Sequence, residues 1–209
     1  MTIQRAYNQW AATYDTDRNL TRDLDALVTR NTLSHQRYRF ILELGCGTGK
    51  NTVTLAPLAG SLLALDFSAE MMAQAQAKVA AEQVRFAQAD LTRPWPVEDN
   101  SVDLVICNLV LEHINRLDFI FAEAARVLVT NGRFFISELH PFRQYMGKKA
   151  VFEQDGQTTE IGAFVHHISD FLQTAAAHDL KLRSLNEWWH EEDQGKPPRL
   201  VTFMFEKTA

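Results

Sequence analysis

Cysteine and long apolar runs are what this 209-residue chain has least of. Its two cysteines, Cys46 and Cys107, lack the spacing of zinc motifs and indicate no disulfide framework. No run of about 18 apolar residues is present that could span a membrane, and residues 1–5 lack the apolar core of a signal peptide. We therefore expect a protein without membrane segments in a reducing cytoplasm.

An excess of basic charge is also absent. The formal net charge is −5, from 21 Lys and Arg against 26 Asp and Glu, which argues against broad binding to nucleic acid or to a membrane surface. The chain has no internal repeat and no low-complexity segment. Apolar residues make up 46% of the chain, which is enough for a sizeable core. We expect a single domain over residues 1–209.

The most informative segment is Glu43-Leu44-Gly45-Cys46-Gly47-Thr48-Gly49. It follows an apolar run, residues 40–42, that predicts a short buried strand, and it precedes residues 50–56, which can begin a helix. Alternate glycines at such a turn remove the side chains that would keep a ligand away from the backbone. The turn therefore predicts a site where a small molecule lies directly on the main chain.

Two phosphate-binding motifs do not fit this turn. The dinucleotide fingerprint G-x-G-x-x-G requires a third glycine where this chain has Lys50. A P-loop ends in Gly-Lys-Ser/Thr, whereas this chain has Asn51 after Lys50 and the wrong upstream spacing. Glu43, two positions before the first glycine, suits a positively charged ligand better than a pyrophosphate.

Short apolar segments alternate with amphipathic ones after the turn. Strands are expected at residues 40–42, 62–65, 84–87, 102–107 and 133–137. Helices are expected after Ser68, which can cap the first of them, and over residues 117–129. Such alternation predicts a parallel sheet with helices on both faces, in which ligands bind beyond the carboxyl ends of the strands.

The rhythm changes beyond residue 139. Residues 140–164 show no clear helix, and residues 165–178 predict one. Two further strands are expected at residues 180–188 and 199–205. Because no helix fits between these two strands, they should pair antiparallel as a hairpin.

The E-x-G-x-G-x-G pattern of residues 43–49 resembles the first motif of class I S-adenosylmethionine-dependent methyltransferases, in their type 11-like form. The resemblance is strong over residues 38–139. Residues 7–15 are similar to a Y-x-x-W-A-x-x-Y-D helix that closes over the cofactor in this family. The N-terminal half resembles enzymes that methylate quinone precursors or the free carboxyl of an acyl-carrier-bound acid.

This resemblance implies an α/β fold with a Rossmann-like, seven-stranded methyltransferase sheet. The sheet would be mostly parallel with an antiparallel terminal hairpin and with helices on both faces. Residues 1–35 would form an N-terminal helical cap, and residues 140–164 a substrate-side insert after the fifth strand. The cofactor would be S-adenosyl-L-methionine, whose sulfonium and ammonium groups explain why carboxylates belong in the pocket.

The resemblance also assigns cofactor contacts to strand tips. Asp66 would accept hydrogen bonds from the ribose hydroxyls, and Asp90 from the adenine amino group, with Leu91 offering its backbone N–H. Met71 would pack on the adenine, and Tyr14 would touch the carboxylate or sulfonium. The full set of expected cofactor residues is Tyr14, Glu43, Gly45, Cys46, Gly47, Gly49, Asp66, Phe67, Met71, Asp90, Leu91 and Asn108.

Catalytic groups are expected where the N-terminal helix, the 140–164 insert and the turn near residues 188–193 meet. His140 is the first candidate for a general base or acceptor-positioning group, followed by His167 and Tyr145. The alternative for each of them is a surface or structural residue, which the sequence favours for any one of the three taken alone. A metal site from His140, His166, His167 and the 190–193 acids would match no known ligand spacing, so we expect no metal.

The sequence therefore predicts a methyltransferase that acts on the oxygen, nitrogen or carbon of a small-molecule acceptor. Basic and aromatic residues of the insert could bind an anionic, partly apolar acceptor, or form a solvated loop. One alternative is a nicotinamide-dependent oxidoreductase, which Lys50 and the Asp90 motif oppose. Another is a non-catalytic S-adenosylmethionine-binding protein, which no residue excludes. Nucleic-acid and membrane partners are not expected, and the oligomeric state is open.

Overall fold

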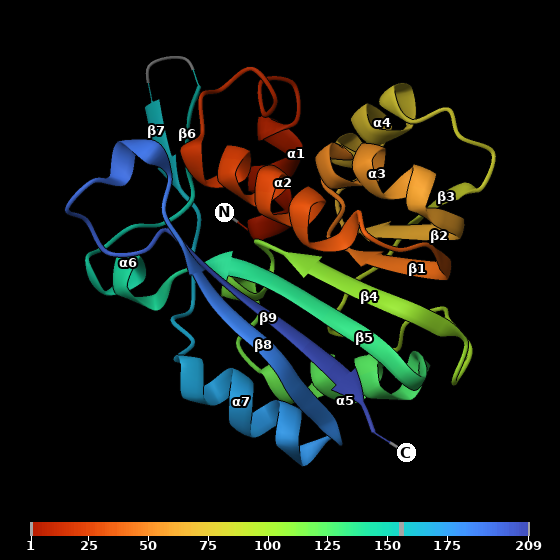
Figure 1. Ribbon diagram of the computed structural model, residues 1–209. Coiled ribbons are helices and arrows are strands. Elements are labelled where there is room, and N and C mark those ends of the chain that lie inside the picture. Colours follow the sequence, from red (N-terminus) through yellow and green to blue (C-terminus); the bar gives the residue numbers. More distant parts are fainter. Residues whose placement is uncertain (1, 155–156, 209) are drawn as a thin grey trace.

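The fold is a seven-stranded, mostly parallel sheet with helices on both faces (Figure 1). The computed structural model describes residues 2–154 and 157–208. The strand order is β3-β2-β1-β4-β5-β9-β8; within this sheet the pairs β5–β9 and β8–β9 are antiparallel and the other described pairs are parallel. The predicted α/β sheet with a terminal antiparallel hairpin is confirmed.

The strands of this sheet are β1 (Tyr38–Leu44), β2 (Ala59–Asp66), β3 (Val84–Gln88), β4 (Val102–Asn108), β5 (Leu128–Leu139), β8 (Leu180–Trp188) and β9 (Leu200–Lys207). The helices are α1 (Ile3–Trp10), α2 (Leu20–Leu33), α3 (Lys50–Leu55), α4 (Ala69–Lys78), α5 (Leu117–Val127), α6 (Pro141–Tyr145) and α7 (Ile168–Ala177). Three 3-10 turns are η1 (Ala56–Leu58), η2 (Leu111–His113) and η3 (Glu191–Asp193). A separate hairpin joins β6 (Val151–Gln154) to β7 (Gln157–Glu160).

Two apolar layers hold the helices to the sheet. On the face that carries α5 and α7, the ring of Phe121 lies 5.4 Å from that of Phe134 and 5.8 Å from that of Phe205, centroid to centroid. On the opposite face, Leu33 of α2 and Leu55 of α3 belong to a second buried cluster with strands of the sheet. Both clusters exclude water, so β1 and β4 are covered on both faces.

The strand order reverses its direction between β1 and β4. The chain runs outward from β1 through β2 to β3, then returns to the other side of β1 for β4. In parallel sheets, such a switch point leaves a crevice beyond the carboxyl ends of the strands, where ligands bind. The glycine-rich turn after β1 lies at this point, as the sequence predicts.

Helix boundaries differ from the predictions at several points. The expected helix over 117–129 ends at Val127, because Leu128 is already extended and pairs with Val102 in the sheet. The expected helix over 165–178 begins only at Ile168. The backbone N–H of Phe164 donates to the carbonyl of Glu112 (2.7 Å), which holds the preceding segment in an extended form.

The expectation of no helix in residues 140–164 is wrong for α6. Pro141 occupies the first turn of α6, and the His140 side chain accepts a hydrogen bond from the Phe142 N–H (3.2 Å). Proline and an N-cap acceptor favour a helix start, and this local signal begins a helix of five residues. Residues 155 and 156 of the insert lie outside the described residues, and the division into cap, insert and remainder stays a prediction.

The N-terminal helix is shorter than the 7–15 pattern indicates, because α1 ends at Trp10. The Arg22 guanidinium donates to the carbonyls of Tyr14 and Asp17. These two carbonyls therefore accept hydrogen bonds from a side chain and not from the backbone N–H groups of a longer helix. The segment between α1 and α2 therefore folds around Arg22 as a series of turns.

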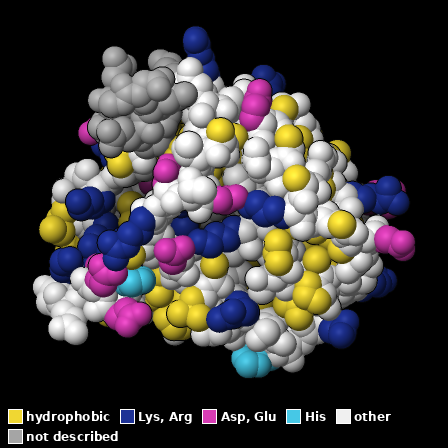
Figure 2. Space-filling view, turned by 90° about the horizontal axis from the view of Figure 1, so that it is seen from above, with side chains coloured by type: hydrophobic (Ala, Val, Ile, Leu, Met, Phe, Trp, Pro, Cys, Tyr) yellow, Lys and Arg dark blue, Asp and Glu magenta, His cyan; other side chains and the backbone are white. Residues whose placement is uncertain are grey.

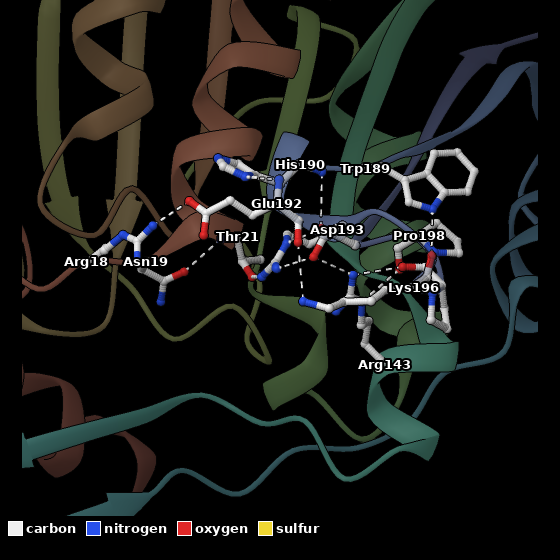
Figure 3. Close-up of polar contacts among 12 residues, drawn as sticks. Arg18, Asn19, Thr21, Arg143, Trp189, His190, Glu192, Asp193, Lys196 and Pro198 are labelled. Atoms are coloured by element: carbon white, nitrogen blue, oxygen red, sulfur yellow. Dashed lines mark hydrogen bonds and ion pairs between the residues drawn. The ribbon is translucent and has the colours of Figure 1, made fainter.

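A buried ion-pair cluster connects the N-terminal helices to the far end of the sheet (Figure 3). The Asp193 side chain is fully buried and pairs with Arg143 (2.9 Å) and Arg199 (2.6 Å). Arg199 also donates to the hydroxyl of Thr21 at the start of α2 (3.1 Å). Burial acts to raise the pKa of Asp193, but these two guanidinium groups hold it well below its usual range. The cluster thus fixes α2 and α6 against the β8–β9 connection.

The surface above the sheet in Figure 1 carries mixed charge. Among its described residues, Lys and Arg side chains are interspersed with Asp and Glu (Figure 2). No described helix combines the length and the apolar character that crossing a bilayer requires.

The Phe121 cluster generates a stability prediction. We expect Phe121→Ala to lower the free energy of unfolding by about 3–5 kcal/mol, because a fully buried ring would leave a cavity between α5 and the sheet. The control Leu27→Ala removes a side chain that is 45% exposed on α2 and should change it by less than about 1 kcal/mol. Urea unfolding of both variants measures the difference, and equal effects would contradict the packing described.

Candidate functional site

A cavity of about 180 Å³ lies beyond the carboxyl ends of β1, β2 and β4, beneath the N-terminal helices. Its lining residues are Ile3, Tyr7, Tyr14, Arg22, Asp25, Glu43, Leu44, Gly45, Cys46, Gly47, Thr48, Lys50, Asn51, Asp66, Phe67, Met71, Ala89, Asp90, Leu91, Thr92, Ile106, Asn108, Leu109, Val110, His113 and Ile114. All twelve predicted cofactor residues except Gly49 are in this set.

The glycines of the turn have different structural roles. Gly47 lines the cavity with φ +52°, and no protein atom lies within 4 Å of the place a Cβ would take. A side chain there would project into the space for a ligand. At Gly45, a Cβ would lie 2.2 Å from Cγ2 of Val110, so glycine lets the turn after β1 approach the segment after β4. At Gly49, a Cβ would lie 2.9 Å from that of Ala75, so this glycine serves the packing of α3 on α4.

Asp66 holds the glycine-rich turn from the tip of β2. Its Oδ2 accepts from the Gly47 N–H and its Oδ1 from the Ser68 N–H, both at 2.8 Å. Burial raises the pKa of Asp66, and these amide donors oppose the rise. Each carboxylate oxygen can accept a second hydrogen bond, so Asp66 keeps acceptor capacity for a ligand at the cavity wall.

Two further carboxylates, Asp25 and Glu43, line the same cavity; with Asp66 we call them the carboxylate trio. Burial, reinforced by the charges of the other two, raises the pKa of Glu43 to about 8. The Thr52 hydroxyl donates to Oε2 of Glu43 at 2.6 Å. A cationic ligand would stabilise the ionised trio, whereas an anionic one would meet repulsion.

Unpaired buried polar atoms gather at this cavity. Among the described residues, five buried side-chain N or O atoms have no hydrogen-bond partner, and three of them belong to cavity-lining residues: Nε of Arg22, Oδ1 of Asn51 and Oδ1 of Asn108. Unpaired buried polar groups are costly in a folded protein. One N–H donor and two carbonyl acceptors are the groups that would complement an amino acid's carboxylate and ammonium.

Arg22 is a site residue that no sequence motif indicated. Its guanidinium lies 3.9 Å above the centre of the Tyr14 ring, which forms part of the cavity wall. The segment after Tyr14 contains two arginines, Arg18 and Arg22, and nothing in the sequence reveals that the chain turns back to bury the second. Asp25 and Asn51 were missed for the same reason, and they join through a 2.9 Å hydrogen bond.

The remaining predicted cofactor residues lie at the cavity in varied settings. Asp90 is exposed at the rim, and its Oδ1 accepts from the backbone and hydroxyl of Thr92 (2.9 and 2.7 Å). The Asn108 amide donates to Asp25 (2.9 Å) and Thr29 (2.7 Å), so only its carbonyl oxygen and backbone remain for a ligand. Met71 is 1% exposed and packs with α1.

The predicted catalytic residues do not line the cavity. His140 is buried; its Nδ1 accepts from the Phe142 N–H, so its Nε2 donates to Oε1 of Glu187 at 2.9 Å. Burial lowers the pKa of His140. Tyr145 of the insert and His167, the residue before α7, contact each other at the surface. The cavity instead contains Tyr7 and His113, which come together from α1 and η2.

Within the described part of the chain, no three His, Cys, Asp or Glu side chains come together in a way that could hold a metal ion. His166 is used structurally, because its Nε2 lies 2.8 Å from the carbonyl oxygen of Ile114.

Known proteins resemble this chain in sequence and in fold. Residues 42–136 match the family model of a methyltransferase domain. An uncharacterized methyltransferase of Emericella nidulans is 26% identical over 220 residues, which cover 87% of this chain and 76% of that protein. A putative S-adenosylmethionine-dependent methyltransferase of Listeria monocytogenes superposes with TM-score 0.75 at 19% identity, covering 90% of this chain and 100% of that one. A complex of DhpI with SAH (S-adenosylhomocysteine) gives TM-score 0.73 at 21% identity, covering 98% and 95%.

The carboxylate trio predicts proton release on binding of a cation. Because burial raises the pKa of Glu43 to about 8, this group is protonated at pH 7 in the free protein. The ammonium of SAH favours the ionised form, so binding should release protons and should strengthen as pH rises toward 8. Calorimetry at pH 7 in two buffers of different ionisation enthalpy measures the released protons.

The variant Glu43→Gln should lose most of this release, and the exposed control Glu70→Gln should keep it. Equal release from wild type and Glu43→Gln, or none from wild type, would contradict the assignment.

Proposed function

Because this chain belongs to the class I S-adenosylmethionine-dependent methyltransferases, we propose that it transfers the methyl group to a small-molecule acceptor held in the cavity under α1 and α2. The observation that supports this most directly is the composition of the cavity wall. It combines a bare glycine turn, the carboxylate trio and the unpaired Nε of buried Arg22. S-adenosylmethionine has a matching set of groups: two cations, one carboxylate and a ribose with two hydroxyls.

The cofactor residues follow from this complementarity. Asp66 would accept from the ribose hydroxyls, and Asp90 with Leu91 would hold the adenine at the rim. Arg22 would donate through Nε to the cofactor carboxylate, forming a charge-assisted bond. Glu43 and the Asn51 carbonyl would face the ammonium.

The chain's own contribution to the reaction is orientation and the exclusion of water. When bound, S-adenosylmethionine supplies a methyl group on a sulfonium, which is already a good leaving group. Aromatic rings of the N-terminal segment close the cavity, with Tyr7 6.1 Å from Phe67 and Trp10 4.6 Å from Tyr14, centroid to centroid. Holding the acceptor in line with the methyl group can contribute about 7–11 kcal/mol of barrier reduction.

A nicotinamide dinucleotide fits this cavity poorly. Its pyrophosphate would lie on the glycine turn, close to the carboxylate of Asp66, which accepts from the Gly47 N–H. Like charges in a water-excluded site repel strongly, since the local dielectric constant is low. The electrostatics of the wall therefore support the methyl donor over a dinucleotide.

Calorimetry with SAH tests the proposal. We expect wild type to bind SAH, and Asp66→Asn to bind it at least tenfold more weakly, about 1.4 kcal/mol, because the ribose loses a charged acceptor. The control Asp118→Asn changes a carboxylate that is 65% exposed on α5 and should leave affinity unchanged. Thermal melting of each variant verifies folding.

NADH added as a competitor should not displace SAH. Absence of SAH binding by folded wild type, or displacement of SAH by NADH, would overturn the proposed function.

A further inference from the structure

Two ionisable side chains of the cavity, 106 residues apart in the sequence, face each other. The Tyr7 hydroxyl of α1 lies 2.7 Å from Nε2 of His113 in η2. Both residues line the cavity, and His113 is the only imidazole among the described lining residues. The cofactor assignments above use neither of them.

The hydrogen bonds of His113 define its tautomer. Its Nδ1 lies 3.0 Å from the carbonyl oxygen of Gly162, which can only accept, so Nδ1 carries the ring proton. In the neutral ring, Nε2 is then a lone-pair acceptor for the Tyr7 hydroxyl. Burial raises the pKa of Tyr7 well above its usual range, and nearby acidic groups raise it further, so the hydroxyl keeps its proton.

The buried carboxylate of Glu112 lies close enough to stabilise a positive charge on His113. Oε1 of Glu112 lies 3.8 Å from Nε2 of His113, and Glu112 is only 6% exposed. Its other oxygen, Oε2, accepts from the amide of Gln144 at 3.4 Å. An imidazolium formed here would therefore meet a buried opposite charge, which stabilises it.

Among the described lining residues, no cationic side chain is free to pair with an anionic acceptor near Tyr7. The charged groups that bear on this hydroxyl include Glu112, Asp66 and Glu138. Of the two cationic side chains among the described lining residues, Lys50 pairs with Asp23 at 2.6 Å. Arg22 donates to backbone carbonyls and has only its Nε left, which the proposed function assigns to the cofactor carboxylate. A carboxylate acceptor would be desolvated beside like charge, which is costly.

We propose that Tyr7 and His113 form a proton relay for the acceptor, and that the acceptor is therefore an alcohol, phenol or amine that loses a proton on methylation. This inference rests on the proposed function and specifies its acceptor class. Tyr7 contacts the acceptor, and His113 acts through Tyr7.

The step balances in atoms and charge. The acceptor's oxygen or nitrogen forms a bond to the methyl carbon, and the carbon–sulfur bond breaks with its electron pair left on sulfur as a thioether. The acceptor's proton passes to the Tyr7 oxygen while the Tyr7 proton passes to Nε2 of His113. The imidazolium pairs with Glu112 and later returns its proton to solvent.

Three measurements on Tyr7→Phe, His113→Gln and the distant control His178→Gln test the relay. Calorimetry with SAH reports on the proposed function alone, and all three variants should bind as wild type does. Nitrogen NMR of the SAH complex, with His113 assigned by loss of its signal in His113→Gln, reports the tautomer. Labelled S-adenosylmethionine is then offered with four probe classes: a phenol, a primary amine, a carboxylic acid and an enolisable ketone.

We expect the Nδ1–H tautomer and labelling of the phenol or amine only. Tyr7→Phe and His113→Gln should lower kcat by about 100-fold or more, as loss of a general base does, and His113→Gln should lose the fall in rate on the acid side. If the contact between Tyr7 and His113 were purely structural, its loss would not change this pH profile while the SAH affinity stays constant.

An Nε2–H tautomer overturns the relay, and so does carboxylate or carbon methylation at equal rates in wild type and variants. If none of the four probes is labelled, the tautomer of His113 alone decides whether the relay stands. Failure of folded wild type to bind SAH would instead overturn the proposed function, so the two failures are distinct.

Discussion

The carboxylate of Asp66 is the contact on which the site depends most. By accepting from the amides of Gly47 and Ser68, it ties the turn after β1 to the helix start after β2. The turn can then expose bare backbone at Gly47, because a neighbouring strand tip holds its shape in place of side-chain packing. The switch point of the sheet provides the crevice, and this one carboxylate gives the crevice a defined wall.

Negative charge around that wall shapes the chemistry of the cavity. Burying Asp25, Glu43 and Asp66 together is unfavourable in the free protein, as the raised pKa values of all three indicate. A ligand with a sulfonium and an ammonium relieves that cost. The same charge extends toward Tyr7 through Glu112 and Glu138, so both the donor end and the acceptor end of the cavity disfavour anions.

Local patterns in the sequence predicted the sheet well and the acceptor side poorly. The apolar segments, the glycine turn and the absence of a helix between residues 188 and 199 lead to the observed strands and hairpin, since each signal is contained within its own segment. The places of Arg22 and His113 in the cavity depend on how α1, α2 and η2 close over the strand ends. No single segment of the sequence encodes that arrangement. His140 directly follows β5, so its sequence position suggests a place at the rim of the cavity. Because Pro141 begins α6, His140 instead caps that helix and contacts Glu187.

A crystal structure of the complex with SAH would test directly how the cavity holds its ligand. We expect the ribose on Asp66 and the ligand carboxylate within hydrogen-bond distance of the Arg22 Nε, with the thioether sulfur directed toward Tyr7. An amino-acid end turned away from Arg22, or SAH bound outside the crevice above Gly47, would contradict it.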